Sequence, residues 1–297
     1  MSAVTPIINS GSSSHTDTVN STYGLIETIA KQTFYGVEAK NPLSSFDKGN
    51  LTKGTDIEQW MIQLTESYAF DKTATDVFSA KDPTYLVRYF KDWTKRQYEQ
   101  SVRDDDIRKI LTGENSVEDV ASKIVANLRA TDDNEKYENM KAIFAKIKSD
   151  MTEGSILPAG TATTATEFLK MVRNVVDEFQ FMSSDYSIAG AKYRCPFERI
   201  RIVMPYGVKN SIDVEKLASL FHVEKAEIEA RIDIIDTTDG IVYIVDEEAI
   251  LHYNRLNEIE NERNIKGRVD NYYLTTDDLF AYSPLFKTTY IDASAID

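Results

Sequence analysis

The sequence has 297 residues, of which 42% are hydrophobic, so the chain is long enough to bury a sizeable core. Its formal net charge is -14, with 48 acidic against 34 basic residues, and this balance argues against a nucleic-acid-binding protein because duplex affinity comes largely from Lys and Arg. The single cysteine, Cys195, excludes an intrachain disulfide and suits a reducing compartment.

Residues 1–22 are rich in Ser, Thr and Asn and nearly uncharged, which favours an extended or disordered arm. They lack the basic and apolar regions of a signal peptide, and no apolar run in the sequence approaches the about 18 residues that a membrane span needs. We therefore expect a soluble protein without membrane association that is made in the cytoplasm. Leu25, Ile26 and Ile29 then predict a short helix over Tyr23–Phe34.

The stretch Asn41–Glu58 contains two Lys-Gly pairs and leads into a segment in which every second residue is apolar. Trp60, Ile62 and Leu64 share one side of this segment, as expected for a strand. A second strand-like run covers Pro83–Trp93, and the polar segment Ser67–Asp82 separates the two. We predict a long protruding hairpin, which needs another surface to lie on because an isolated two-stranded hairpin is marginally stable.

Two helices are predicted next. The first begins at the N-cap Ser116 and keeps an apolar face to Met151, with Ala130–Asn134 as the expected place for a bend or break. The second covers Thr166–Phe179, with Phe168, Leu169, Val172, Val175 and Val176 as its core face.

The remainder mixes both patterns. A strand is predicted at Glu198–Pro205 and a helix at Asp213–Phe221. The segments 232–236 and 241–246 flank the turn Thr237–Gly240, which indicates a hairpin or adjacent strands. A polar stretch rich in Asn and Glu then leads to an expected aromatic strand pair within Gly267–Ile291. The fold class is therefore α+β.

Two motifs suggest nucleotide or DNA chemistry, and both have a simpler interpretation. The apolar run Ile241–Glu248 resembles a Walker B strand, but no glycine is followed by the lysine that a phosphate-binding loop requires, so we predict a buried strand that ends in a solvated acidic turn. The segment Asp213–Ile232 has the spacing of a helix-turn-helix. Its second helix is acidic, which opposes entry into a DNA groove.

Other reactive side chains lack partners in the sequence. His15, His222 and His252 match no metal-binding spacing, so each is expected to be an incidental polar residue. Cys195 has no identifiable base, so a small buried hydrophobic side chain is expected at that position. The acidic runs at 104–106, 132–133 and 277–278 could flank a metal, but charge runs are usually solvated. We therefore predict no catalytic residue, no cofactor and no bound metal, and we keep a metal-dependent hydrolase as an alternative.

Several segments, in this order and at this spacing, resemble one protein family. They are "NPL" at Asn41–Leu43, Phe46, Lys48–Gly49, "YAFD" at Tyr68–Asp71, "KYENMKAIFAKI" at Lys136–Ile147, "TEFLKMVR" at Thr166–Arg173, and "YIVDEEAILHYNRL" and "NIKGRVDNYYL" near the C-terminus. Together they resemble the major capsid proteins of tailed bacteriophages with the Hong Kong 97-type fold, and most closely the phi 29-like podovirus branch.

The resemblance implies a division of the chain. It assigns residues 1–45 to an N-terminal arm and 46–104 to an extended loop that lies over an adjacent subunit. Residues 105–154 form a peripheral domain with a spine helix, 155–253 an axial domain, and 254–297 the strands that return to the peripheral domain. The sequence stops at Asp297, so we expect it to lack the immunoglobulin-like domain of that branch.

The implied function is that of a major head protein rather than an enzyme. Many copies assemble into pentamers and hexamers of an icosahedral or prolate shell, in the virion, after synthesis in the bacterial cytoplasm. The expected partners are other copies of the chain, a scaffolding protein, a portal, and enclosed double-stranded DNA that is not bound sequence-specifically. No crosslinking lysine or asparagine can be mapped, so the shell is expected to be non-covalent. An encapsulin-type compartment is the alternative within this fold.

The hinge and hairpin supply the candidate interface residues. Gly49 and Gly54 permit backbone angles that other residues resist, while Lys48 and Lys53 are expected to meet the acidic surface of a neighbouring subunit. The remaining candidates are aromatic: Trp60, Tyr68, Phe70, Phe78, Tyr85, Tyr89 and Trp93.

Overall fold

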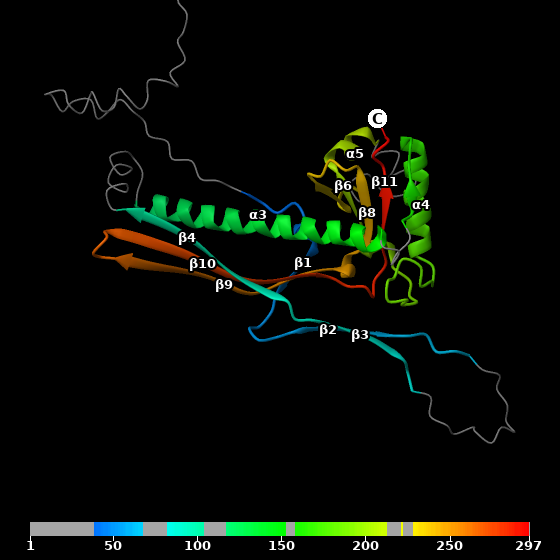
Figure 1. Ribbon diagram of the computed structural model, residues 1–297, viewed down its shortest axis with the longest axis horizontal. Helices are drawn as coiled ribbons and strands as arrows, with labels where there is room; N and C mark the ends of the chain where they lie inside the picture. Colours follow the sequence, from blue (N-terminus) through cyan, green and yellow to red (C-terminus); the bar gives the residue numbers. More distant parts are fainter. Residues whose placement is uncertain are drawn as a thin grey trace, which may run out of the picture. The chain divides into compact units, whose positions relative to one another are not determined.

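The computed structural model describes residues 39–67, 82–103, 117–152, 158–212, 221 and 228–296 (Figure 1). Several predicted features lie outside these residues. They are most of the arm, the Tyr23–Phe34 helix, nearly all of the hairpin tip, Ser116, the acidic run 104–106, His15, His222 and most of the segment 213–227. Within them, no helix combines the length and the apolar composition that crossing a membrane requires.

The chain divides into two compact units. The first consists of Met1–Ala39, Gln97–Asp132 and Glu258–Leu274, and the second of Lys40–Arg96, Asp133–Asn257 and Thr275–Asp297. Four elements contribute residues to both units: β4 (Trp93–Arg103), α3 (Val117–Thr152), β9 (Ile250–Asn264) and β10 (Val269–Tyr282). The predicted division by assembly role stays a prediction.

The core of the first unit is small. Ile124 and Leu128 of α3 pack with Leu274 of β10, and half-buried Tyr98 and Val102 of β4 (Trp93–Arg103) border them. Because strand side chains alternate between faces, Gln97 and Glu99 lie on the face of β4 that points away from this core.

The second unit is built on a five-stranded sheet whose order is β5-β11-β8-β6-β7. The strands are β5 (Gly160–Thr161), β6 (Ile200–Pro205), β7 (Ile232–Ile235), β8 (Ile241–Asp246) and β11 (Thr288–Asp292). The other short elements are α4 (Ala165–Phe179), α5 (Tyr206–Ser211) and the 3-10 turns η2 (Ser44–Phe46), η3 (Phe197–Arg199) and η4 (Glu247–Ala249).

Both faces of this sheet are buried, each by one helix. Phe168, Val172 and Phe179 of α4 pack on one face, together with Ile202 and Ile244 of the sheet. The other face packs against the second half of α3, and its cluster is Leu43, Phe46, Tyr137, Met140, Ile143, Phe144, Ile147, Val203, Tyr243 and Val245. Successive residues of β8 therefore alternate between two cores, which explains why the five residues before Asp246 are all apolar.

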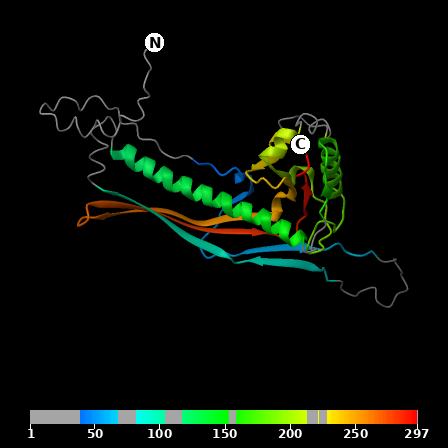
Figure 2. The same ribbon diagram turned by 45° about the horizontal axis from the view of Figure 1, so that its top comes forward.

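A second sheet has the order β1-β9-β10-β4, in which β1 (Asp47–Asn50) runs parallel to β9. The remaining strands, β2 (Ile57–Ile62) and β3 (Tyr85–Phe90), pair only with each other in a two-stranded antiparallel sheet within the described residues. They are the blue and cyan ribbon labelled in Figure 1 and seen from a second side in Figure 2.

Several predicted elements are confirmed. The helix at Thr166–Phe179 is α4, and its N-cap Thr164 accepts a hydrogen bond from the Glu167 amide. The strand at Glu198–Pro205 is β6, and the alternation after Thr55 is that of β2.

Other predictions are wrong. The long helix does not break at Ala130–Asn134, where Asp132 is buried and no glycine or proline interrupts the hydrogen-bond ladder. The segments around Thr237–Gly240 are not adjacent strands, because β6 lies between β7 and β8 and pairs with both. Gly240 instead accepts a hydrogen bond from the Ala293 amide at 2.9 Å, so the turn holds the C-terminal segment.

The prediction of an aromatic strand pair within Gly267–Ile291 is also wrong, because β10 and β11 belong to different sheets. The partner of β10 is β9, a 15-residue strand that covers the polar stretch to which no strand was assigned. Its last eight residues are all exposed, so they lack the alternation that marks a half-buried strand. The second hairpin strand ends at Phe90, and Trp93 begins β4 in another sheet.

Candidate assembly surfaces

The stretch that precedes the hairpin is fixed to the second unit by its first residues. Asn41 is buried, with its Oδ1 accepting from the Leu43 amide at 2.9 Å and its Nδ2 lying 3.4 Å from Met140 Sδ. Leu43 and Phe46 are fully buried, and the Phe46 ring meets Phe144 edge to face at 5.9 Å. The hairpin therefore starts from a rigid base on α3.

Two glycines turn the chain between this base and β2. Gly49 has φ +93° and Gly54 has φ +88°, both in the left-handed region that L side chains rarely adopt. The Gly49 amide donates to Asp47 Oδ1 at 2.9 Å, and the Leu51 amide donates to the Asn254 carbonyl at 2.7 Å. We call Asp47–Gly54 the hairpin root.

Lys48 of the root has acidic partners in its own chain. Its Nζ lies 3.2 Å from Glu248 Oε1 and 3.6 Å from Glu247 Oε1, and its side chain is 13% exposed. From the sequence, Lys48 was expected to contact a neighbouring subunit, because the sequence does not show that the fold brings Glu247 and Glu248 next to Lys48. Lys53 is exposed, and it is the lysine of the root that we carry forward as an interface candidate.

The neighbouring Asp47 belongs to a buried charged cluster that the sequence did not reveal. His252 of β9 is 1% exposed, and its Nε2 lies 3.2 Å from Asp278 Oδ1 of β10. Its Nδ1 lies 3.4 Å from Asp47 Oδ1, an ion-pair distance that lacks the geometry of a hydrogen bond. Asn254 Nδ2 donates to Asp278 Oδ1 at 2.8 Å, and Lys136 Nζ of α3 lies 3.9 Å from the same oxygen.

The cluster stabilises the charged forms of His252, Asp278 and Asp47. Burial alone lowers the pKa of His252, but its contacts with Asp278 and Asp47 outweigh burial and raise that pKa above its ordinary value. Burial likewise opposes ionisation of Asp278, yet His252, Lys136 and Asn254 bring its pKa below the ordinary value. The close contact with His252 is the main reason why the pKa of Asp47 is lowered. The sequence interpretation of His252 as an incidental polar residue is therefore wrong.

The hairpin itself exposes one apolar side. Pairing places Trp60 opposite Val87 and Ile62 opposite Tyr85, and opposite residues of an antiparallel pair share a face. Beside the exposed carboxylate of Glu58, the five exposed apolar side chains of this side are Trp60 (58%), Ile62 (63%), Leu64 (54%), Tyr85 (46%) and Tyr89 (54%). We call them the hairpin apolar face. Contiguous exposed apolar surface of this kind is typical of an interaction site.

Of the other aromatic interface candidates, the structure describes only Trp93. Trp93 is half-buried at the start of β4, where the Arg255 guanidinium lies 4.3 Å from its ring centroid. It therefore packs within its own chain and is not part of the hairpin apolar face. Tyr68, Phe70 and Phe78 lie outside the described residues.

The strand β8 is buried as predicted, but its last residue, Asp246, is buried too and is not part of a solvated turn; Glu247 and Glu248 after it are half-buried. Asp246 is fully buried and accepts hydrogen bonds from Arg199 Nη2 at 2.7 Å and from Tyr193 Oη at 2.9 Å. Its Oδ1 also accepts from the Glu248 amide at 3.0 Å, which starts η4. This carboxylate is therefore occupied by a structural network.

Cys195 lies near this network and is buried with a free thiol, as predicted. Burial raises the pKa of its thiol, which opposes a role as a nucleophile. Lys287 is also buried, and its ammonium donates to the carbonyls of Phe179 at 3.2 Å and Phe181 at 2.9 Å, at the end of α4. Both side chains serve the packing around α4.

The acidic pair at 277–278 does not form a metal site. Asp277 accepts from Arg255 Nε at 2.7 Å and Asp278 belongs to the His252 cluster, so both are buried and ion-paired, contrary to the expected solvated face. Among the described residues, no group of His, Cys, Asp and Glu has the arrangement that would hold a metal ion. These contacts leave the hydrolase alternative without a set of free ligands in the part of the chain that the structure describes.

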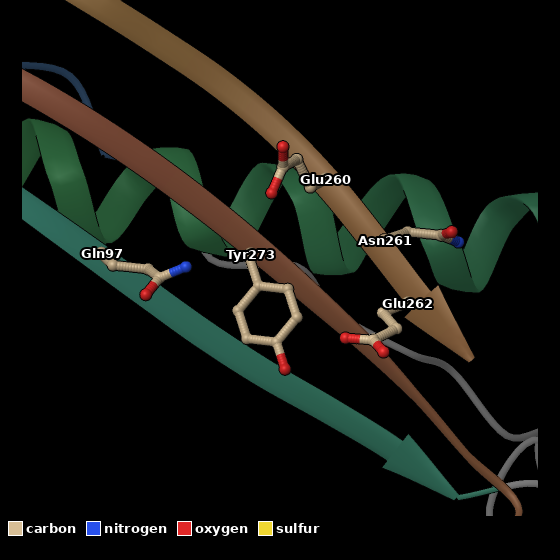
Figure 3. A pocket seen from close by; sticks show the side chains of 5 residues that line it. All are labelled: Gln97, Glu260, Asn261, Glu262 and Tyr273. Atoms are coloured by element: carbon tan, nitrogen blue, oxygen red, sulfur yellow. The ribbon is translucent and has the colours of Figure 1, made fainter. Parts of the chain in front are cut away.

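A hollow of about 650 Å³ in the first unit is lined by Gln97, Tyr273 and the β9 residues Glu260, Asn261 and Glu262 (Figure 3). Its lining side chains come from three neighbouring strands, and the helix lies behind these strands in the view. The hollow is open and polar. It therefore has the character of a solvated surface.

Comparison with known proteins gives consistent matches. The protein-family model for Phi29-like phage major capsid protein matches residues 6–291. The major capsid protein of Bacillus phage GA-1 is 24% identical over 270 residues, which cover 87% of this chain and 57% of that protein. The chain thus spans a little over half the length of this curated relative.

Solved structures match over nearly the whole chain. A chain in the capsid structure of Staphylococcus phage Andhra has a TM-score of 0.71 at 12% identity, covering 89% of this chain and 87% of that chain. A chain in the acidic stable capsid structure of Helicobacter pylori bacteriophage KHP30 has a TM-score of 0.59 at 8% identity, covering 98% of both chains. At such identities the likeness carries the fold alone.

Proposed function

The chain belongs to the family of Phi29-like phage major capsid proteins and has the predicted Hong Kong 97-type α+β fold, and from this premise we propose that many copies assemble into a closed phage head. In this proposal the copies form pentamers and hexamers of an icosahedral or prolate shell. The shell encloses double-stranded DNA and forms in the cytoplasm of the host bacterium.

The observation that carries the proposal is the hairpin apolar face. Its five side chains are each 46% to 63% exposed, although a two-stranded hairpin is marginal in water without a surface to cover it. A neighbouring copy would supply that cover. Burying a large apolar side chain contributes about 1.5–3 kcal/mol, so this face alone could support a specific contact between copies.

The assembly roles follow from this contact. We assign residues 46–104 to the extended loop that clamps a neighbour, with Gly49, Lys53 and Gly54 in its hinge and the hairpin apolar face on its contact side. Residues 105–154 and 254–297 serve as the peripheral domain and 155–253 as the axial domain. The aromatic candidates Tyr68, Phe70 and Phe78, which lie outside the described residues, are assigned to the same loop.

The remaining partners follow from the container role. A shell that holds a packed polyanion should enclose DNA without gripping it, and a chain of net charge -14 avoids strong counterion-release binding. A scaffolding protein and a portal are the expected assembly partners. The role is structural and not catalytic.

The test is expression of the full chain with and without a scaffolding partner, followed by sedimentation and electron microscopy. Closed shells of uniform size support the proposal. A compact monomer at high concentration under all conditions, with metal-dependent hydrolysis, contradicts it. An enzyme cargo that purifies with the shell in place of DNA would favour the encapsulin-type alternative.

A further inference from the structure

A buried histidine contacts the hairpin root within the second unit. Asp47, the first residue of β1, lies opposite His252 in the parallel pairing of β1 with β9. The His252 ring also stacks on Phe280 of β10, with the ring centroids 4.7 Å apart and the planes 12° from parallel. The imidazole is therefore confined in both position and orientation.

Both ring nitrogens face a carboxylate. Nε2 lies 3.2 Å from Asp278 Oδ1, and Nδ1 lies 3.4 Å from Asp47 Oδ1. A neutral imidazole carries one N–H, so one of its nitrogens would direct a lone pair at a carboxylate. Only the imidazolium donates from Nε2 to Asp278 and also places an N–H and positive charge at Nδ1 beside Asp47, which makes the protonated ring the complementary form.

The charges around the ring lead to the same conclusion. The charged groups that face it are Asp47 from β1, Asp278 from β10 and, through Asp278, Lys136 from α3. Asn254 of its own strand contributes a neutral amide. With His252 protonated the cluster is neutral, and with His252 neutral it carries one excess negative charge that Asp47 can relieve by moving toward water. The side chain of Asp47 is already 48% exposed, so this movement is open to it.

We propose that His252 is a positioning residue whose imidazolium fixes the hairpin root against β9 and β10, and so sets the orientation in which the hairpin meets a neighbouring copy. The effect on the contact with a neighbouring copy rests on the proposed function, whereas the effect of His252 on the hairpin root rests on the cluster geometry. Loss of the proton releases Asp47 and loosens the root, while Lys48 still holds Glu247 and Glu248. The root is thus loosened and not detached.

The test is hydrogen-deuterium exchange of the full, unassembled chain between about pH 5.5 and pH 8.5, the range in which histidine titrates. We expect the amides of the hairpin root, Leu51 among them, to exchange about threefold to fivefold faster above the titration of His252 than below it, after correction for intrinsic rates. The amides of β8 serve as the internal control and should show no such step.

Two variants decide whether His252 is the cause. His252→Gln keeps a polar side chain without a titrating charge, so its root should exchange at one rate across this range. Asp47→Asn removes the half-exposed partner with little risk to folding and should flatten the profile in the same way. An unchanged pH step in either variant, or a flat profile in the unmodified chain, overturns the inference. If His252→Gln fails to fold, Asp47→Asn and the unmodified chain still decide it.

Electron microscopy of the same proteins under assembly conditions separates this inference from the proposed function. If shells form but the exchange rate of the root shows no step with pH, only the role of His252 is contradicted. A pH step in a chain that never assembles contradicts the shell function and leaves the contact between His252 and the root intact.

Discussion

Trp60 and Tyr85 meet edge to face on the hairpin, with their ring centroids 5.9 Å apart and their ring planes at 74°. They come from opposite strands, and both belong to the hairpin apolar face, with 58% and 46% of their surface exposed. Edge-to-face contacts between aromatic rings fix side-chain orientation. The hairpin therefore presents a preformed apolar surface.

Replacing this surface should stop assembly without unfolding the subunit. We expect the double variant Trp60→Ser/Ile62→Thr to lower the yield of closed shells at least tenfold, since two buried apolar side chains contribute more than about 1.4 kcal/mol per contact. Sedimentation measures the yield, and circular dichroism checks the fold. Trp60→Phe/Ile62→Val keeps the surface apolar and should assemble normally. Normal shells from the polar double variant would show that this face is not a contact.

Gly240 should be irreplaceable at the end of the turn before β8. It has φ +67°, and a Cβ there would lie 2.4 Å from Ser294 Cα, so alanine adds both backbone strain and a clash with backbone. We expect Gly240→Ala to lower the free energy of unfolding by about 2–5 kcal/mol. Gly207→Ala is the matched control, because its Cβ meets nothing within 4 Å in α5, and it should change stability by less than about 1 kcal/mol. Equal effects in denaturant titrations would refute the explanation.

The Arg199–Asp246 pair should matter more than a surface pair of the same residue types. Asp246 is fully buried, so Arg199→Met leaves a carboxylate without its main partner, and we expect a loss of about 3 kcal/mol, at the low end for buried pairs because Arg199 is partly exposed. Arg173→Met breaks an exposed pair with Asp177 on α4 and should cost less than about 1 kcal/mol. Chemical denaturation of both variants measures the difference, and similar losses would contradict a structural role for Asp246.

The His252 cluster also predicts how stability depends on pH. The pKa of His252 is raised above 6.5, so its contribution is complete below pH 6.5 and is lost as the pH rises through the pKa of the folded state. The pKa values of Asp47 and Asp278 are lowered below 3.8, so their contributions are complete above pH 3.8 and are lost as the pH falls through the folded values. The cluster therefore contributes most between these limits.

Thermal unfolding of the unmodified chain and of His252→Gln across this range measures that contribution. The difference in melting temperature should be largest at about pH 5–6 and should shrink at higher pH, where His252 has lost its proton. A difference that grows as the pH rises above 7 would mean that the neutral ring is the stabilising form.

Local patterns in the sequence predicted the elements that carry strong periodicity. The apolar face of α4 and the alternation of Trp60, Ile62 and Leu64 are each complete within one segment, so no distant residue is needed to interpret them. The positive φ values at Gly49 and Gly54 also agree with their interpretation as hinge residues.

What the sequence could not predict depends on distant pairing. The exposed half of β9 is held by its neighbours in the sheet and carries no burial pattern of its own. The insertion of β6 between β7 and β8 is a matter of topology, for which the turn Thr237–Gly240 gave a misleading local signal. Glu248 lies 200 residues from Lys48 along the chain, and Asp278 lies 26 residues from His252. The sequence alone therefore could not show that Lys48 and His252 have acidic partners.

The central claim is that the hairpin apolar face is covered by a neighbouring copy in a closed shell. Cryo-electron microscopy of particles assembled from the full chain tests it directly. The map should show Trp60, Ile62 and Tyr85 of one subunit in van der Waals contact with the adjacent subunit of the same capsomer. A closed shell in which these three side chains face solvent would contradict the claim.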